Sequence, residues 1–252
     1  MGVDDYQRFE RLTFDDFRRM ATDESLSRYE KIGFPDAYRE GKEEAIWRDI
    51  TAKLPALARR DRVVLDIGPG CSELPRLLIE LCRRQGHKLL LVDSAEMLAQ
   101  LRDAPFIAKH AGYYPHCPEL LAAYRGRVDV VLSYSVLHYV FAEANVWAFL
   151  DTALELLAHG GELLVGDIPN VSKRKRFFSS PAGIKFHQEF TGRTEETPEV
   201  VCNRVEPQLI DDAVVLALLS RARLAGCDAY VVPQAPELPM ANRREDILIR
   251  KP

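Results

Sequence analysis

Short apolar runs, a glycine-containing loop and the spacing of the last two apolar runs together predict an α/β fold. The apolar runs are typical of buried parallel strands, and they alternate with segments of helical period. The glycine loop joins the first run to the next helix, as in nucleotide-binding folds. No helical period separates the last two runs, which predicts an antiparallel pair. We therefore expect a Rossmann-like, doubly wound, mostly parallel sheet that ends in a C-terminal antiparallel strand pair.

The composition fits a globular enzyme domain with a small-molecule partner. The chain has 252 residues, of which 47% are hydrophobic, so it can bury a full core and is not a disordered chain. Lys and Arg number 34 and Asp and Glu number 38, which gives a net charge of −4. This balance lacks the basic field of most nucleic-acid binders, so we expect no nucleic-acid partner.

The sequence also limits the compartment. The five cysteines are widely spaced and form no CxxC motif, so neither a zinc site nor a disulfide framework is indicated. The segment 1–6 does not begin like a signal peptide, and no apolar run reaches the ~20 residues that a membrane span needs. We expect a cytoplasmic protein without a membrane span; the sequence does not predict its oligomeric state.

Residues 1–60 are predicted to form an N-terminal helical cap, because apolar side chains recur there at helical spacing on both sides of a turn at Gly33-Phe34-Pro35. Residues 61–252 are predicted to form the sheet domain. Its predicted strands cover 63–67, 89–93, 106–109, 128–132, 162–165, 229–232 and 246–249. Its predicted helices cover 72–86 and 94–101, with Ser72 and Ser94 as caps, about 143–161, and 212–225. The polar stretch 168–209 is a predicted insertion after strand five.

The glycine loop is the most specific motif. In Asp66-Ile67-Gly68-Pro69-Gly70, Gly68 permits a tight turn and Gly70 lets a ligand approach the backbone. Dinucleotide sites place a third glycine three residues later, where this chain has Glu73, whose charge would repel a pyrophosphate. Asp66 suits a cation, and Asp93 ends the second strand, where an acid can accept hydrogen bonds from ribose. These residues favour a ligand with a ribose and a positive centre.

On this loop, on Asp93 and on the order of elements from Arg62 onward, the sequence resembles the class I S-adenosylmethionine-dependent methyltransferases. The resemblance implies S-adenosyl-L-methionine as cofactor. It places Asp66, Gly68 and Gly70 beside its methionine part and Asp93 at its ribose. Further implied cofactor residues are Ser94, Met97, Gly112, Tyr113, Ser133 and, for the cofactor's carboxylate, Arg39. The alternatives are a turn-stabilising role for Asp66, an ordinary surface position for Arg39, and a chance GxG in another Rossmann-like domain.

In this family, methyl transfer needs proximity and, for a hydroxyl acceptor, a base. The acceptor is expected beyond the carboxyl ends of the strands. His138 is the first candidate base, Asp167 is a second catalytic candidate, and His187 in the insertion is a third. Each has a structural alternative: a packed histidine, a turn cap, or a surface group. Tyr134 and Asn170 are candidate substrate-binding residues. Asp167 and Asn170 alone do not make a metal site, so none is predicted.

The run Lys173-Arg174-Lys175-Arg176 is the only concentrated basic segment. It is either an ordinary solvated loop or an anion-binding segment, with Lys173 and Arg174 contacting an acceptor that carries a phosphate or carboxylate. Within the predicted insertion, this segment would form part of a substrate lid.

The sequence thus predicts methyl transfer to a small or carrier-linked polar metabolite, with oxygen favoured as the accepting atom. The alternatives are an aminopropyl transferase, an NAD-dependent reductase and a non-catalytic cofactor-binding module. The basic run disfavours polyamine substrates, and Glu73 disfavours a dinucleotide.

Overall fold

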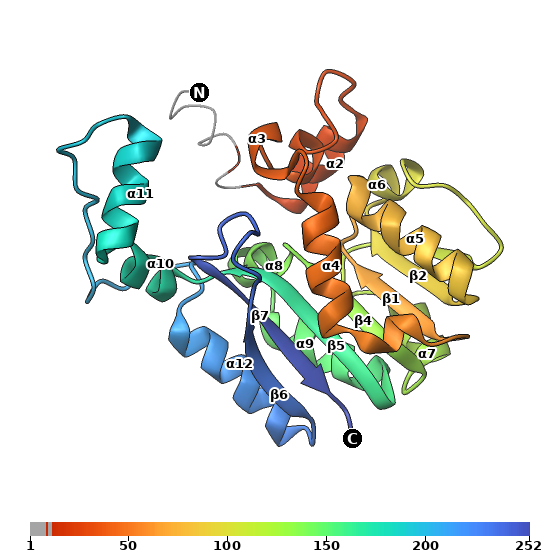
Figure 1. Cartoon of the computed structure of the whole chain (residues 1–252). Coiled ribbons are helices and arrows are strands. Elements are labelled where there is room, and N and C mark those ends of the chain that lie inside the picture. Colours follow the sequence, from red (N-terminus) through yellow and green to blue (C-terminus); the bar gives the residue numbers. More distant parts are fainter. Residues whose placement is uncertain (1–8, 10–11) are drawn as a thin grey trace.

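A computed structural model of the chain describes residue 9 and residues 12–252. They form an α/β domain around one sheet, in the strand order β3-β2-β1-β4-β5-β7-β6 (Figure 1). The strands are β1 Val63–Ile67, β2 Lys88–Asp93, β3 Ile107–Ala111, β4 Val128–Tyr134, β5 Leu157–Pro169, β6 Asp228–Pro233 and β7 Arg244–Arg250. Strands β1 to β5 are parallel, and β7 lies antiparallel between β5 and β6. The predicted fold class is confirmed.

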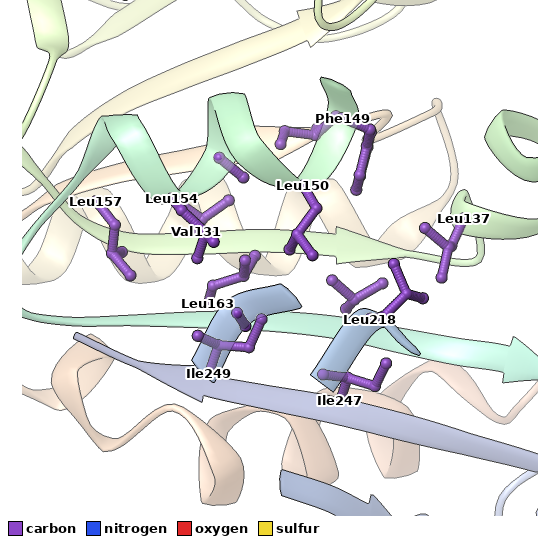
Figure 2. Packing of buried hydrophobic residues seen from close by; sticks show 14 of the residues in the cluster. Val131, Leu137, Phe149, Leu150, Leu154, Leu157, Leu163, Leu218, Ile247 and Ile249 are labelled. Atoms are coloured by element: carbon purple, nitrogen blue, oxygen red, sulfur yellow. The ribbon is translucent and has the colours of Figure 1, made fainter. Parts of the chain in front are cut away.

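Helices cover both faces of the sheet. On one face lie α4 (Glu43–Lys53), α5 (Glu73–Gln85) and α6 (Ala95–Ala99). On the other lie α7 (Pro118–Tyr124), α8 (Leu137–Glu143), α9 (Val146–Leu156) and α12 (Asp212–Leu224). Neighbouring strand residues point to opposite layers: Val64 packs with the first group and Leu65 with the second. Figure 2 shows Leu150 of α9 and Leu218 of α12 meeting strand residues such as Leu163 in the second layer.

The N-terminal segment packs against the sheet domain near α6 and the start of α5. It contains α2 (Phe14–Thr22), the 3-10 turn η1 (Glu30–Ile32) and α3 (Asp36–Arg39); a second 3-10 turn, η2 (Pro55–Ala58), follows α4. Arg18 of α2 pairs with Glu96 at 2.8 Å, and Arg28 pairs with Glu73 at 3.0 Å. We call residues 12–40 the cap. The predicted cap also includes residues 1–8, 10 and 11, which lie outside the described residues.

The predicted insertion contains two helices, α10 (Val171–Phe178) and α11 (Pro181–Thr191). They pack on each other through aromatic rings, with Phe177 and Phe186 at 5.7 Å between centroids. In Figure 1 they lie on the opposite side of the molecule from α5 and α6.

Two predicted element boundaries are wrong. The helix predicted for about 143–161 is α9 alone, and it ends at Leu156 because Leu157 already pairs with Val128 of β4. The helix α8, which precedes it, was not predicted. The glycines at 160 and 161 therefore lie inside β5, which also runs on to Pro169 because β7 pairs with it beyond a register shift. Ser72 makes no side-chain capping bond, whereas Ser94 accepts one from the Met97 backbone N–H at 3.2 Å, as predicted.

No helix in residues 12–252 is long and apolar enough to cross a membrane.

Truncation of a central strand residue tests the packing of the second layer. Leu163 is fully buried between α9 and α12. We expect Leu163→Ala to lower the free energy of unfolding by about 2–5 kcal/mol, because the removed methyl groups leave a cavity. Leu216→Ala on the exposed side of α12 is the control, with an expected change within about 0.5 kcal/mol. Urea unfolding measures both; equal effects would contradict this description of the core.

Candidate functional site

The glycine loop lies between β1 and α5 and needs glycine at two positions. Gly68 and Gly70 have φ angles of +71° and +63°, in the left-handed region that L-residues rarely adopt. A Cβ at Gly68 would lie 2.6 Å from Val136 Cγ2, and one at Gly70 would lie 2.6 Å from Ile32 Cγ2. The second contact comes from the cap, so the cap closes directly over the loop.

A cavity, which we call the loop cavity, lies between the glycine loop and the cap and has a volume of about 140 Å³. Its walls come from the ends of β1, β2 and β4, from the segment after β3, from α8 and from the cap. The predicted residues that line it are Arg39, Gly68, Gly70, Asp93, Met97, Gly112, Tyr113 and Tyr134. The cap adds an aromatic and aliphatic wall that the sequence interpretation missed, formed by Phe14, Phe17, Ile32 and Phe34.

Asp93 is one of two acidic residues in this lining, with Glu143. Its Oδ2 accepts from the Gly70 N–H at 3.0 Å and its Oδ1 from the Ser94 N–H at 2.7 Å. Burial raises the pKa of Asp93 to about 6, although these two hydrogen bonds oppose the shift. Its carboxylate keeps free lone pairs for hydroxyl donors, since each oxygen accepts only one of these bonds.

Three other predicted cofactor residues do not line the loop cavity. Asp66 is buried in β1, and burial together with the neighbouring Asp93 raises the pKa of Asp66 to about 8, so it is mostly protonated at neutral pH. Ser94 is the cap of α6. Ser133 is fully buried in β4, and its hydroxyl has no hydrogen-bond partner among the described residues. Their cofactor contacts stay predictions.

A buried ion cluster joins the cap to the sheet. Arg39 Nη2 donates to Ser135 Oγ at 2.6 Å and lies 3.3 Å from Asp167 Oδ2, and Arg244 of β7 also pairs with Asp167. Ser135 donates to the same carboxylate, and Gln234 Nε2 lies 3.4 Å from its other oxygen. Burial would raise the pKa of Asp167, but the two arginines and these hydrogen bonds hold it below its usual value. Asp167 is therefore already paired by the protein itself.

A second, larger cavity adjoins the first; we call it the outer cavity. Its volume is about 670 Å³, and it shares Phe34, Tyr139 and Glu143 with the loop cavity. The cap, α8, α10 and the link before β7 form its walls. We call the shared residues the junction.

His138, the predicted base, lines the outer cavity. Its Nδ1 is buried and has no hydrogen-bond partner in the part of the chain that the structure describes. Burial and the nearby Arg244 lower the pKa of His138 to about 3, so the imidazole is neutral at physiological pH.

The other predicted catalytic and substrate residues are largely engaged elsewhere. Asn170 lines the outer cavity, but its Oδ1 caps α10, and its Nδ2 donates to Asp212 and Glu245 at 2.8 and 2.7 Å. His187 Nε2 lies 3.3 Å from Glu196 on the far side of the insertion and lines neither cavity. Tyr134 lies in the loop cavity, and its hydroxyl is 3.4 Å from Gln234.

The basic run is helical, within α10, and its four members differ. Lys173 donates to the Arg244 backbone carbonyl at 2.6 Å, Lys175 pairs with Glu206 at 2.8 Å, and Arg176 pairs with Asp212. Only Arg174 lines the outer cavity. It is joined there by Arg243 and Arg244, which the sequence interpretation missed because they lie some seventy residues away in the proline-containing link and β7.

Among the described residues, no group of three or more His, Cys, Asp or Glu side chains is arranged to hold a metal ion.

Comparison with known proteins places this geometry in context. The family model of the methyltransferase domain matches residues 38–190, more than half of the chain. No curated protein sequence matches.

Solved structures share the fold. A protein described as a methyltransferase, in complex with the Haloferax volcanii Trm112 methyltransferase activator, is 14% identical, with 94% of this chain and 98% of that chain covered and a TM-score of 0.54. The CurJ carbon methyltransferase is 18% identical; the match covers 85% of this chain and 56% of that chain, with a TM-score of 0.53. A Methanococcus maripaludis protein described as an S-adenosyl-L-methionine-dependent methyltransferase is 16% identical. The match covers 96% of this chain and 94% of that chain, with a TM-score of 0.50.

The raised pKa of Asp66 predicts a pH-dependent stability. The folded pKa of about 8 exceeds the ordinary value of 3.8, so the folded state binds the proton more tightly and loses stability as the pH rises from about 3.8 to about 8, where the loss is complete. We expect the free energy of unfolding of the wild type to fall by at most about 1.4 kcal/mol per pH unit across this range.

Asp66→Asn should remove this part of the slope and stabilise the protein at alkaline pH, whereas the exposed Asp103→Asn should not. Urea unfolding at a series of pH values measures the slopes. An unchanged slope in Asp66→Asn would show that Asp66 is ionised in the folded protein.

Proposed function

The chain belongs to the methyltransferase domain family, and we propose that it transfers the methyl group of S-adenosylmethionine to a small or carrier-linked polar acceptor, with oxygen as the accepting atom. The observation that carries the proposal is the pair of contiguous cavities. One lies against the glycine loop and contains Asp93; the other opens from it past Phe34 and Tyr139 and contains His138. A cofactor and an acceptor that meet at this junction would have their reacting atoms in proximity.

The loop cavity fits the cofactor chemically. Gly68 and Gly70 line this cavity with backbone, and the space at their missing side chains is taken by Val136 and by Ile32 of the cap. Asp93 offers a hydrogen-bond acceptor for ribose hydroxyls. The guanidinium of Arg39 lines the same cavity and has N–H groups beyond those given to Ser135 and Asp167, which suit the cofactor's carboxylate. When bound, S-adenosylmethionine supplies a methyl group already activated on a positively charged sulfur.

The cap takes part in this proposal as a moving element. The loop cavity, at about 140 Å³, is smaller than the roughly 300–1,000 Å³ typical of ligand sites. Phe14, Phe17 and Ile32 of the cap fill the space in front of the glycine loop. We therefore expect residues 12–34, which carry these side chains, to open and reclose over the cofactor, while Arg39 stays in its ion cluster and α4 stays packed in the core. Residues 168–209 would act as the lid of the outer cavity.

His138 supports oxygen as the accepting atom. A hydroxyl loses its proton as it attacks the methyl carbon, and the unpaired Nδ1 of His138 is the candidate acceptor for that proton. Because burial lowers the pKa of His138 to about 3, the support for this role is its position in the outer cavity and not its basicity. Asp167 is held by two arginines and serves as a positioning residue for Arg39 and Arg244 in this scheme.

The family match also bears on the alternatives. The charge of Glu73 argued against a dinucleotide, but Arg28 pairs with it at 3.0 Å, which weakens that argument. The match to the methyltransferase domain, rather than Glu73, therefore favours methyl transfer over a reductase, an aminopropyl transferase or a non-catalytic module.

Calorimetric titration with S-adenosylmethionine tests cofactor binding. We expect the wild type to bind and Asp93→Asn to bind at least about tenfold more weakly, because hydrogen bonds to a charged group contribute about 1.5–3 kcal/mol. Affinity should also fall as the pH drops through about 6, where Asp93 becomes protonated, and this dependence should vanish in the variant. Asp103→Asn is the matched control. Absence of binding by the wild type would refute the proposal.

Turnover of His138→Gln tests the base. The acceptor is first identified by incubating extracts of the source cells with methyl-labelled cofactor and finding the labelled product by mass spectrometry. With that acceptor, we expect turnover to fall by about 10²–10⁴-fold while cofactor affinity stays constant. His159→Gln is the control, because His159 lies near the start of β5 and lines neither cavity. Normal turnover of His138→Gln would exclude His138 as the base; His187→Gln in the same assay tests the remaining candidate.

A further inference from the structure

The outer cavity has an uneven distribution of charge. Three arginines line it, Arg174, Arg243 and Arg244, whereas Glu143 is the only carboxylate among its described lining residues. Arg244 pairs with Asp167, a carboxylate that it shares with Arg39. The other two arginines in this wall are Arg174 and Arg243.

Neither of these two arginines has a carboxylate partner among the described residues. Arg243 donates to the amide oxygen of Asn242 at 3.1 Å and is hydrogen-bonded to the phenol of Tyr38. Arg174 contacts an aromatic ring. By contrast, Lys175 and Arg176 on the same helix each pair with a carboxylate outside the cavity. Lys175 and Arg176 thus have carboxylate partners, whereas Arg174 and Arg243, which line the cavity, have none among the described residues.

The two guanidinium groups contact the same aromatic ring, Phe178. The Cζ atoms of Arg174 and Arg243 lie 5.8 and 5.9 Å from the centroid of Phe178, and Arg243 Cζ also lies 5.7 Å from that of Phe186. Cation–π contacts of this kind fix the planes of the guanidinium groups while their N–H donors stay available. Burial and the neighbouring arginines lower the pKa of Arg243, a cost that a bound anion would offset.

The rest of the lining is mainly apolar or aromatic, including Leu12, Phe34, Val171, Leu209 and Met240. Glu143 lines both cavities, so negative charge in a ligand is favoured beside Arg174 and Arg243 and disfavoured at the junction.

From this arrangement we infer that the acceptor carries a carboxylate or phosphate group on an apolar or planar body. Arg174 and Arg243 bind the anionic group, and the accepting atom points to the junction at Tyr139. The paired planar donors suit the bidentate recognition of either anion. The inference rests on the proposed function, to which it adds the chemical class and the orientation of the acceptor.

Binding of matched small probes to the full chain, saturated with S-adenosylhomocysteine, tests the inference. The probes are benzoate, phenyl phosphate and the neutral benzamide, each measured by calorimetric or NMR titration. We expect at least one anion to bind about tenfold or more tightly than benzamide. The stronger of the two anions identifies the group as carboxylate or phosphate.

The arginine variants assign the preference to the site. Arg243→Gln and Arg174→Gln should each weaken anion binding about tenfold and leave benzamide unchanged, and Arg243→Lys should lose less than Arg243→Gln. Arg176→Gln, on the same helix but paired with Asp212, should have no effect. Because Arg174 is exposed, Arg174→Gln remains a valid test even where Arg243→Gln fails to fold.

The outcomes separate this inference from the proposed function. The inference is overturned if the anions bind no more tightly than benzamide, or if none of the probes binds. It is also overturned if the preference for an anion persists in both Arg174→Gln and Arg243→Gln. If S-adenosylhomocysteine binds in the same experiment, cofactor binding stands and only the anionic acceptor is refuted. If it does not bind, the proposed function itself fails.

Discussion

The buried carboxylate of Asp167 is the group on which the geometry of both cavities depends. It lies at the carboxyl end of β5 and accepts hydrogen bonds from Arg39 of the cap, Arg244 of β7 and Ser135 after β4. An irregular register between β5 and β7 makes this possible, because Gly166 and Asp167 lie where pairing is interrupted. Removal of one partner of a buried ion pair costs about 3–5 kcal/mol, so this cluster fixes the cap, the sheet edge and the last strand relative to one another.

The same cluster defines the boundary between the two cavities. The Phe34 ring has Arg39 Cζ at 4.2 Å and Arg244 Cζ at 5.7 Å from its centroid, and it lines both cavities. A second buried pair, Lys53 with Asp246 at 2.7 Å, ties α4 to β7, and Asp246 also accepts from the Asp167 backbone N–H at 2.8 Å. Arg39 is thereby presented to the cofactor side, and Arg244 and its neighbour Arg243 to the acceptor side.

The features that could be predicted from sequence are those with a local physical cause. Buried parallel strands are short apolar runs, and a glycine loop between strand and helix follows from the φ angles that Gly68 and Gly70 adopt. The hairpin of β6 and β7 follows from the lack of a crossover helix. The fifth strand was predicted only over 162–165, because its first residues, from Leu157, continue the helical pattern of α9, and only pairing with Val128 decides the boundary.

More of the residues predicted from sequence line the loop cavity than line the outer cavity. Arg39, Asp93, Met97 and Tyr113 line the loop cavity, as expected from their positions at strand ends and before the sheet. Asn170 resembled a substrate ligand, yet its amide is consumed by a helix cap, which depends on partners at Asp212 and Glu245 that no local pattern indicates. Arg243 lines the same cavity as Arg174 because the link before β7 returns to α10, which no local sequence pattern predicts. The adjacent arginines Arg243 and Arg244, at the start of β7, were the sequence feature that could have pointed to this wall.

The most direct test of this account is a crystal structure of the chain with S-adenosylhomocysteine. The account predicts the ribose hydroxyls at Asp93, the ligand's carboxylate at Arg39 and the sulfur directed past Tyr139 to the outer cavity. A ligand bound elsewhere, or a sulfur that faces away from the outer cavity, would contradict it.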